Sequence, residues 1–241
     1  MNFTFVFPVL ISFVISALLG PVVIPYLRKL KVGQTTRDDG PQSHLKKNGT
    51  PTMGGIMILL AVVITSLIYM KDYPKILPIL FLTLGFGIIG FIDDYIKVVK
   101  KRNLGLTALQ KILLQLLVST AYAVVMYIYG KGGFYIPFFG YVEWGIWYIP
   151  FTIFVIVAMS NATNLTDGVD GLCGFTGFVA SLALLLISGF ANQLPQSILA
   201  VSLAGGLAGF LLWNFHPAQV FMGDTGSLFI GGALTALAFG I

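Results

Sequence analysis

Five aspartates stand in three short segments whose composition points to metal and phosphate chemistry. The segments are GFIDDYIKVVKKR with Asp93 and Asp94, NATNLTDGVDGL with Asp167 and Asp170, and FMGDTGS with Asp224. The second and third segments contain no Lys or Arg, whereas a solvated loop normally mixes both signs of charge. Carboxylate oxygens suit Mg²⁺, which proteins typically hold with one or two carboxylates together with substrate phosphates. The three segments therefore predict a divalent cation site.

Each segment also has a purely structural interpretation. Asp93 and Asp94 could cap a helix end, although acids at a helix C-terminus oppose the helix dipole. Adjacent helical residues point about 100° apart, so these two carboxylates should face different partners. Asp167 and Asp170 precede glycines, as in turns with Asx caps, but would share one face if the segment were helical. GDTGS precedes an apolar run, so its N–H groups form either an ordinary N-cap or an anion site.

The elements that must position these aspartates are strongly apolar. Hydrophobic residues make up 57% of the 241 positions and charged residues only 10%, and the mean hydropathy is +0.91. A soluble domain carries about a quarter charged residues, so this composition predicts an integral membrane protein. Cys173 is the only cysteine, which excludes an intrachain disulfide.

Eight apolar runs are long enough, or nearly so, to cross a bilayer, which takes about 20 residues. They lie near residues 3–27, 54–70, 76–92, 107–129, 146–160, 172–191, 197–213 and 227–241. None alternates with period two, so a β-barrel is not expected. We predict an all-α, polytopic transmembrane bundle of about eight spanning helices, the last one incomplete. The first run lacks a preceding basic residue and a cleavage site, so it is expected to be a retained helix.

The basic residues orient this bundle. Eleven of the fourteen Lys and Arg residues fall in the loops after the first and third runs, which the positive-inside rule places in the cytoplasm. The N-terminus is then outside, and the five aspartates lie at the cytoplasmic face. The loop at 130–145, rich in Gly and aromatic residues, is expected outside, as a short hairpin on the membrane surface. This topology signal alone can explain the net charge of +5, without nucleic acid as a partner.

Four segments closely resemble the phospho-N-acetylmuramoyl-pentapeptide transferase family of the polyprenyl-phosphate N-acetylhexosamine-1-phosphate transferase superfamily. They are KKNGTPTMGG, GFIDDYIKVVKKRNLGLTALQK, NATNLTDGVDGL and FMGDTGS. The aspartate motifs resemble the whole superfamily, whereas residues 33–55 look specific to the muramoyl-pentapeptide branch. The resemblance covers essentially the whole chain, in the expected order.

The family continues past Ile241 with further helices and a histidine-rich cytoplasmic loop. Residues 1–241 are therefore expected to form a single integral membrane transferase domain that lacks the C-terminal helices. We expect such a chain to turn over negligibly by itself. We also expect the carbonyls at the end of its last helix to be unpaired inside the bilayer, where each unsatisfied group costs several kcal/mol.

The resemblance implies a Mg²⁺-dependent transferase of the bacterial plasma membrane, multi-pass, with its active site at the cytoplasmic face. Its partners would be UDP-N-acetylmuramoyl-pentapeptide, undecaprenyl phosphate and the lipid bilayer, but not nucleic acid, and a homodimer is one candidate assembly. Phospho-N-acetylmuramoyl-pentapeptide would pass to the lipid phosphate with release of UMP, giving the first lipid-linked peptidoglycan precursor.

The resemblance also assigns roles to individual residues. Asp224 is the implied Mg²⁺ ligand, and Asp93 and Asp94 assist the metal or deprotonate the lipid phosphate. Phe221 would stack on uracil, although an aromatic residue at the membrane interface is an equally simple interpretation. The implied substrate-binding residues are Lys47, Lys97, Lys101, Asn164, Asp167, Asp170, Asn214 and Phe221.

Two other functions use similar residues. A sister transferase acting on UDP-N-acetylglucosamine would share the aspartate motifs, and residues 33–55 argue against it. A cation or phosphate transporter would also combine Gly-rich helices with intramembrane acids. The expected gathering of the acids at one membrane face, and the lack of an evident inverted repeat, argue against a transporter.

Overall fold

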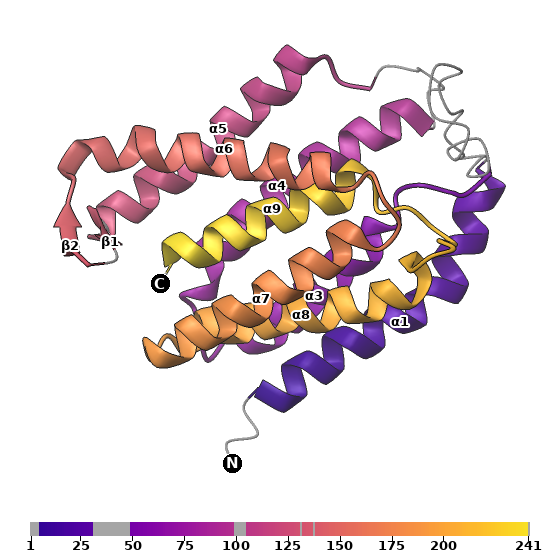
Figure 1. Ribbon diagram of the computed structural model, residues 1–241, viewed down its shortest axis with the longest axis horizontal. Coiled ribbons are helices and arrows are strands. Elements are labelled where there is room, and N and C mark those ends of the chain that lie inside the picture. Colours follow the sequence, from indigo (N-terminus) through magenta and orange to yellow (C-terminus); the bar gives the residue numbers. More distant parts are fainter. Residues whose placement is uncertain (1–4, 31–48, 99–104, 131, 137, 241) are drawn as a thin grey trace.

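Each of the eight apolar runs forms a helix in the computed structural model, which describes residues 5–30, 49–98, 105–130, 132–136 and 138–240 (Figure 1). The elements are α1 (Val6–Lys29), α3 (Gly55–Met70), α4 (Ile76–Val98), α5 (Ala108–Ile128), β1 (Gly133–Ile136), β2 (Gly140–Glu143), a 3₁₀ turn (Gly145–Trp147), α6 (Tyr148–Thr166), α7 (Leu172–Phe190), α8 (Leu194–Asn214) and α9 (Gly223–Gly240). The predicted all-α, polytopic class is confirmed.

Six of these helices are long and apolar enough to cross a membrane: α1, α4, α5, α6 with its preceding 3₁₀ turn, α7 and α8. Helix α3 is apolar but has only 16 residues. Helix α9 has 18 residues, several of them Gly, Ser or Thr, and does not reach the same apolarity. All eight predicted runs are therefore helices, but only six of these helices have the length and composition of a membrane span.

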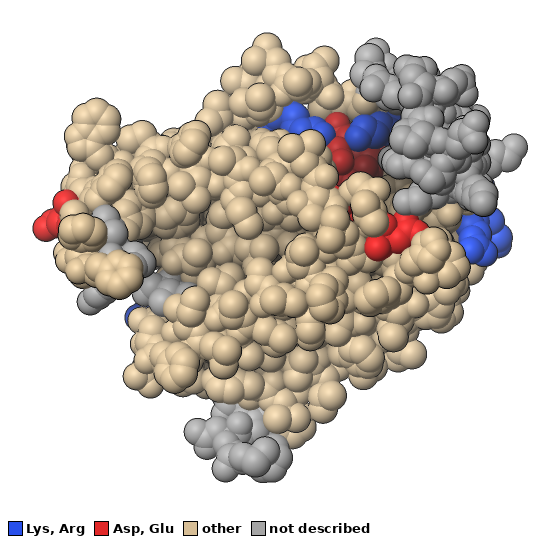
Figure 2. All heavy atoms as spheres, in the orientation of Figure 1, with Lys and Arg blue, Asp and Glu red and all other residues tan. Residues whose placement is uncertain are grey.

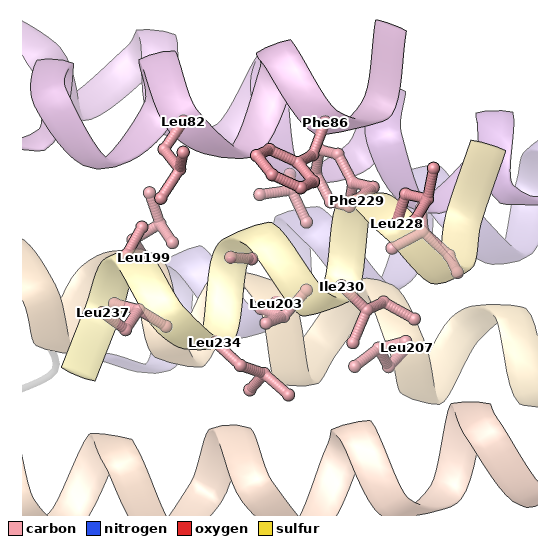
Figure 3. Close-up of a cluster of buried hydrophobic side chains, with 14 of the residues drawn as sticks. Leu82, Phe86, Leu199, Leu203, Leu207, Leu228, Phe229, Ile230, Leu234 and Leu237 are labelled. Carbon is pink, nitrogen blue, oxygen red and sulfur yellow. The ribbon is translucent and has the colours of Figure 1, made fainter. Parts of the chain in front are cut away.

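Helix α9 occupies the interior of the bundle. Every residue from Thr225 to Leu237 is buried, and α9 contacts α3, α4, α6, α7 and α8. Figure 3 shows apolar side chains of α4, α8 and α9 meeting in this core, with Phe86 of α4 beside Phe229 of α9. A helix surrounded by protein needs less apolarity than one that faces lipid. This explains how a run containing Thr225, Ser227 and Thr235 can lie at the centre.

Small and polar residues line the contact between α1 and α8. Ser12 and Ser16, four residues apart on α1, are fully buried. The indole Nε1 of Trp213 on α8 donates a hydrogen bond to the carbonyl of Ala17 at 3.1 Å. Close backbone approach through small residues is the usual way in which helices associate in membranes, where apolar contact with lipid is nearly as favourable.

The carbonyls near the end of α9 have side-chain partners. Gln196 Nε2 of α8 donates to the Gly240 carbonyl at 2.6 Å, and the Tyr122 hydroxyl of α5 donates to the Ala236 carbonyl at 3.0 Å. The expectation of unpaired terminal carbonyls is therefore wrong for Gly240. Polar side chains of neighbouring helices therefore donate hydrogen bonds to these buried carbonyls.

The predicted hairpin is present between α5 and α6. Strands β1 and β2 pair antiparallel, with Phe134 opposite Val142. It lies at the opposite end of the bundle from the ends of α4, α6 and α8 and the starts of α3, α5, α7 and α9, which lie toward the top and right in Figure 1. The segments that carry the five aspartates therefore meet at one end of the bundle, as expected.

Candidate active site

Three carboxylates from two helices form the centre of the site. Asp93 and Asp94 lie near the end of α4, and Asp224 lies in the first turn of α9, with one oxygen of each within 4.8 Å of the others. Figure 2 shows acidic atoms recessed between basic ones at this end of the molecule. As the helical geometry predicts, the two neighbouring aspartates contact different partners.

Asp94 caps α9 from another helix. Its Oδ2 accepts hydrogen bonds from the Thr225 backbone N–H at 2.8 Å and from the Thr225 hydroxyl at 2.6 Å. Its Oδ1 accepts one from the Asp224 N–H at 3.2 Å. Of the two interpretations of GDTGS, these contacts fit a helix cap, which the side chain of Asp94 supplies from α4.

Asp93 is the acid that faces the lysines. Its Oδ1 accepts a hydrogen bond from the Leu106 N–H at 2.8 Å, and its Oδ2 pairs with Lys97 and, at 3.5 Å, with Lys111 Nζ. Asp224 Oδ2 lies 3.0 Å from Lys97 Nζ and 2.7 Å from Lys111 Nζ. Both ammonium groups are thus shared by Asp93 and Asp224, and the four side chains form one charge network.

The network holds Asp224 ionised. Asp224 precedes the apolar part of α9 and lies outside the six candidate spans. Burial by itself raises the pKa of its carboxyl, but a hydrogen bond with Asp93 and the charges of Lys97 and Lys111 outweigh burial and place the pKa well below its usual range. The site therefore offers a fixed negative charge at neutral pH.

The other oxygen of Asp224 is positioned by α6. Asn164 Nδ2 donates to Asp224 Oδ1 at 2.8 Å and lies 2.8 Å from the Ser227 hydroxyl, which itself donates to the Gly223 carbonyl. Asp167, one turn after Asn164, accepts a hydrogen bond from the Gly223 N–H at 3.2 Å. The end of α6 thus holds the start of α9 on the side away from the lysines.

The expectation that Asp167 and Asp170 could share a helical face is not met. Helix α6 ends at Thr166, and residues 167–171 form turns. Asp170 instead accepts from the Ala218 N–H at 3.3 Å, and its Oδ2 lies 3.2 Å from His216 Nδ1. Asp167 therefore faces the start of α9, whereas Asp170 faces the loop between α8 and α9.

Asn214 joins the same two loops. It is almost fully buried at the end of α8, accepts a hydrogen bond from the Gly171 N–H at 3.1 Å and donates to the Val220 carbonyl at 2.9 Å. Phe221, half-buried in the next segment, is tied through its backbone to Pro51 and Gly54, at 2.8 Å each. The motif before α3 thus lies against the motif before α9.

Two glycines make this close packing feasible. A Cβ at Gly90 of α4 would lie 2.1 Å from the Asp224 carbonyl oxygen, and a Cβ at Gly55 of α3 would lie 2.2 Å from the Gly226 nitrogen. Neither position could hold a larger residue without moving the backbone that carries Asp224. The glycines of the two motifs are therefore required by the approach of α3 and α4 to α9.

The structure brings together most of the predicted site residues. Lys97, Asn164 and Asp167 contact the acidic cluster or its helix directly, and Asp170, Asn214 and Phe221 lie in the adjoining loops. Lys47 and Lys101 lie outside the described residues.

Lys111 and Thr225 contact the acidic cluster but were not predicted as site residues. Lys111 is the only charged residue of α5, and it follows a capping box of Thr107 and Gln110 that begins the helix. A single lysine in the first turn of an otherwise uncharged helix is the sequence feature that could have identified Lys111 as a site residue. Thr225 lies within the recognised GDTGS motif, but nothing local identifies its bond to Asp94.

The donor set fits a divalent cation. Carboxylate oxygens of Asp93, Asp94 and Asp224 are the hard ligands that Mg²⁺ prefers. The oxygens of Asp93 and Asp224 converge, and the Lys97 side chain that pairs with them is about one-third exposed. Asp93 and Asp224 would supply the oxygens that hold such a cation, which would add positive charge to the site.

Comparison with known proteins identifies related chains. Residues 76–241 match the model of glycosyl transferase family 4, and residues 47–59 match the phospho-N-acetylmuramoyl-pentapeptide-transferase signature 1. The chain is 47% identical over 231 residues to the phospho-N-acetylmuramoyl-pentapeptide-transferase of Caldicellulosiruptor bescii, covering 95% of this chain and 72% of that protein. It is 46% identical over 242 residues to that of Bacillus subtilis, covering 96% and 74%, and 45% identical over 237 residues to that of Acetivibrio thermocellus, covering 97% and 72%.

Proposed function

Because the chain belongs to the phospho-N-acetylmuramoyl-pentapeptide-transferase family, we propose that it transfers phospho-N-acetylmuramoyl-pentapeptide from its UDP-activated form to undecaprenyl phosphate and releases UMP. The product is the first lipid-linked precursor of peptidoglycan. The observation that best supports this reaction is the network of Asp93, Asp224, Lys97 and Lys111 at one end of a membrane bundle. A nucleotide from water and a phosphate carried by a membrane lipid can meet there.

The lysines fit the electrostatic demand of the reaction. An anionic lipid phosphate must approach an anionic pyrophosphate, so catalysis depends on positioning and on neutralising charge. Lys97 and Lys111 stand close enough to Asp93 and Asp224 to compensate them before substrate enters. When phosphates bind, the same ammonium groups turn to the phosphate oxygens. Each lysine then binds a substrate phosphate and stays next to the carboxylate of Asp93 or Asp224.

The acids would hold Mg²⁺ in the substrate complex. Asp224 is the principal ligand and Asp93 assists it, because their oxygens face the same space. The ion supplies further charge neutralisation for the pyrophosphate when bound. Asn164 fixes the orientation of the Asp224 carboxylate through Oδ1, which leaves Oδ2 directed at the lysines.

Asp94 acts as a positioning residue in this proposal. Both of its oxygens accept hydrogen bonds from the first turn of α9, so the carboxylate stabilises the helix that carries Asp224. A strong base is not required, because a phosphate monoester has a second pKa of about 6 and is largely ionised at neutral pH. Of the two neighbouring aspartates, Asp93 is therefore the one that acts on the reacting groups.

The loops beside the acidic cluster would bind the nucleotide. Asp170 and Asn214 hold the segments around Gly171 and Val220 in place, next to Phe221, and Asp167 holds Gly223. In this proposal Phe221 stacks on uracil and Asn164 lies on the diphosphate side. The acidic end faces the cytoplasm, where UDP-linked sugars are made available, as the distribution of Lys and Arg predicts.

The test is a reconstituted transfer assay with purified substrates, measuring UMP release in lipid nanodiscs. Since the relatives are longer, the assay uses both the 241-residue chain and this chain joined to the C-terminal part of the Bacillus subtilis relative. We expect UMP release that requires undecaprenyl phosphate and the muramoyl-pentapeptide donor. Equal release with UDP-N-acetylglucosamine would support the sister transferase instead. No lipid-dependent release from either form would overturn the proposal.

A further inference from the structure

The hairpin between α5 and α6 carries aromatic side chains that the transfer reaction does not use. Phe138 is fully exposed and Phe139 is 80% exposed, at the turn that joins β1 to β2. Phe138 has a φ of 71°, a left-handed backbone conformation that is unfavourable for a bulky residue. A glycine would fit this turn with less strain. Two exposed phenyl rings in a strained turn suggest contact with an apolar partner.

The hairpin is held firmly against the bundle on its inner side. The ring of Phe134 on β1 stacks on Tyr148 of α6 at a centroid distance of 5.0 Å, and meets Phe151 at 5.0 Å and Phe239 of α9 at 5.6 Å. Trp144 packs edge-on against Phe134 at 5.6 Å. These contacts join the hairpin to both α6 and α9, so its turn has a defined position relative to the helices.

The neighbouring helix ends indicate where the membrane surface lies. Tyr129 directly follows α5 and is 76% exposed, and Trp147 directly precedes α6 and is 71% exposed. Exposed Tyr and Trp at the ends of spans mark the headgroup level of a bilayer. Only a few residues separate each helix end from the hairpin, and Figure 1 shows its strands running across the helix ends, not along their axes. The hairpin therefore lies next to two exposed aromatic residues of the kind that mark the headgroup level.

From this arrangement we propose that the turn of the hairpin, through Phe138 and Phe139, inserts into the boundary between lipid headgroups and acyl chains on the membrane surface opposite the acidic site. The partner is the lipid bilayer itself. Phenyl rings at this depth bury apolar surface, while Glu143 on the same hairpin stays exposed to water. Contact with lipid on one side and the Phe134 cluster on the other fixes the position of the α5 and α6 ends in the membrane.

The test measures the depth of single nitroxide labels on the whole chain in nanodiscs of phosphatidylethanolamine and phosphatidylglycerol. Cysteines replace Phe138 or Phe139 in a Cys173→Ser background, with Glu143→Cys as the matched aqueous control and Val22→Cys, exposed on α1, as the control for the bilayer interior. We expect collision with oxygen to exceed collision with a water-soluble nickel chelate several-fold at 138 and 139, and the opposite order at 143.

Two results would overturn the proposal. If labels at 138 and 139 collide with the nickel chelate as readily as the label at 143, the turn lies in water. If they show spin–spin broadening that disappears when labelled protein is diluted with unlabelled protein, a second copy of the chain covers the turn. Both outcomes are independent of the transfer activity, because the hairpin lies at the opposite end of the bundle from the acids.

Discussion

Asp94 and Thr225 are joined by two hydrogen bonds, from the backbone N–H and from the hydroxyl of Thr225, although they are 131 positions apart in the chain. The next residue back from Thr225 is Asp224. The bond between α4 and α9 therefore sets where the Asp224 carboxylate stands relative to Asp93. Preorganised charge of this kind costs no rearrangement when the substrates react.

Thr225→Val should lower both stability and turnover. The change keeps the shape of the side chain and removes the hydroxyl donor to a buried carboxylate, a loss of about 1.5–3 kcal/mol. Thermal unfolding in detergent and UMP release report the two effects. Thr235→Val is the matched control, because its hydroxyl donates only to carbonyls of its own helix. An unchanged turnover in Thr225→Val with a normal control would show that the bond does not position Asp224.

Asp224→Asn should abolish transfer and leave membrane insertion intact. The substitution preserves the hydrogen bond from Asn164 at Oδ1 but removes the charge that faces Lys97 and Lys111. Loss of a charged metal ligand removes several kcal/mol of transition-state stabilisation. Initial rates across a Mg²⁺ titration measure the effect, with Asp72→Asn in a distant loop as control. Near-normal turnover at limiting Mg²⁺ would refute the assignment of Asp224 as the ligand.

Lys111 and Asp93 should be energetically coupled. Lys111→Gln leaves the buried Asp93 and Asp224 carboxylates with one ammonium group fewer, which is strongly destabilising for buried charges. Adding Asp93→Asn removes one of those charges, so the double variant should lose less stability than the two single losses together. We expect a coupling of about 0.5–3 kcal/mol in thermal unfolding. Strict additivity would mean that the lysine and the acid act separately.

The two ends of the bundle should label from opposite sides of the membrane. In a Cys173→Ser background, Leu165→Cys beside the acidic site should resist a membrane-impermeant maleimide in intact cells. Asp72→Cys and Glu143→Cys, exposed at the other end, should react. The expectation rests on the excess of Lys and Arg in the segments that follow the first and third apolar runs. Labelling of Leu165→Cys from outside would reverse the predicted orientation.

Much of the fold could be predicted from the sequence because each membrane helix needs a continuous run of apolar residues, which is visible locally in the sequence. Each apolar run became a helix, and the charges of the loops predicted that the aspartates would gather at one end. The burial of α9 was not predictable in this way, since its run resembles the lipid-facing ones over a short window. What distinguishes α9 is its set of neighbours, and those come from the packing of five other helices.

The sequence predicted which residues belong to the site better than it predicted which side chains contact one another. Asp93, Asp94 and Asp224 were identified because a charged side chain beside a membrane-like segment is costly unless it has a function. The division of roles between Asp93 and Asp94 depends on Lys111 and Thr225, each distant in sequence from its acid. Contacts between side chains far apart in the sequence produce no periodic pattern that could predict them. At residues 167–171 the chain forms turns instead of a helix, because each aspartate is followed by a glycine.

Helix α9 is bonded at both ends by side chains of other helices, Asp94 at its start and Gln196 at its last carbonyl. Its surroundings from Thr225 to Leu237 are protein, whereas α1, α5 and α7 present most of their surfaces outward. A change in bilayer thickness acts on the helices that touch lipid, which respond by tilting. The position of Asp224 is set by contacts that lipid does not reach. We therefore expect transfer by this chain, joined to the C-terminal part of the Bacillus subtilis relative, to depend little on acyl-chain length.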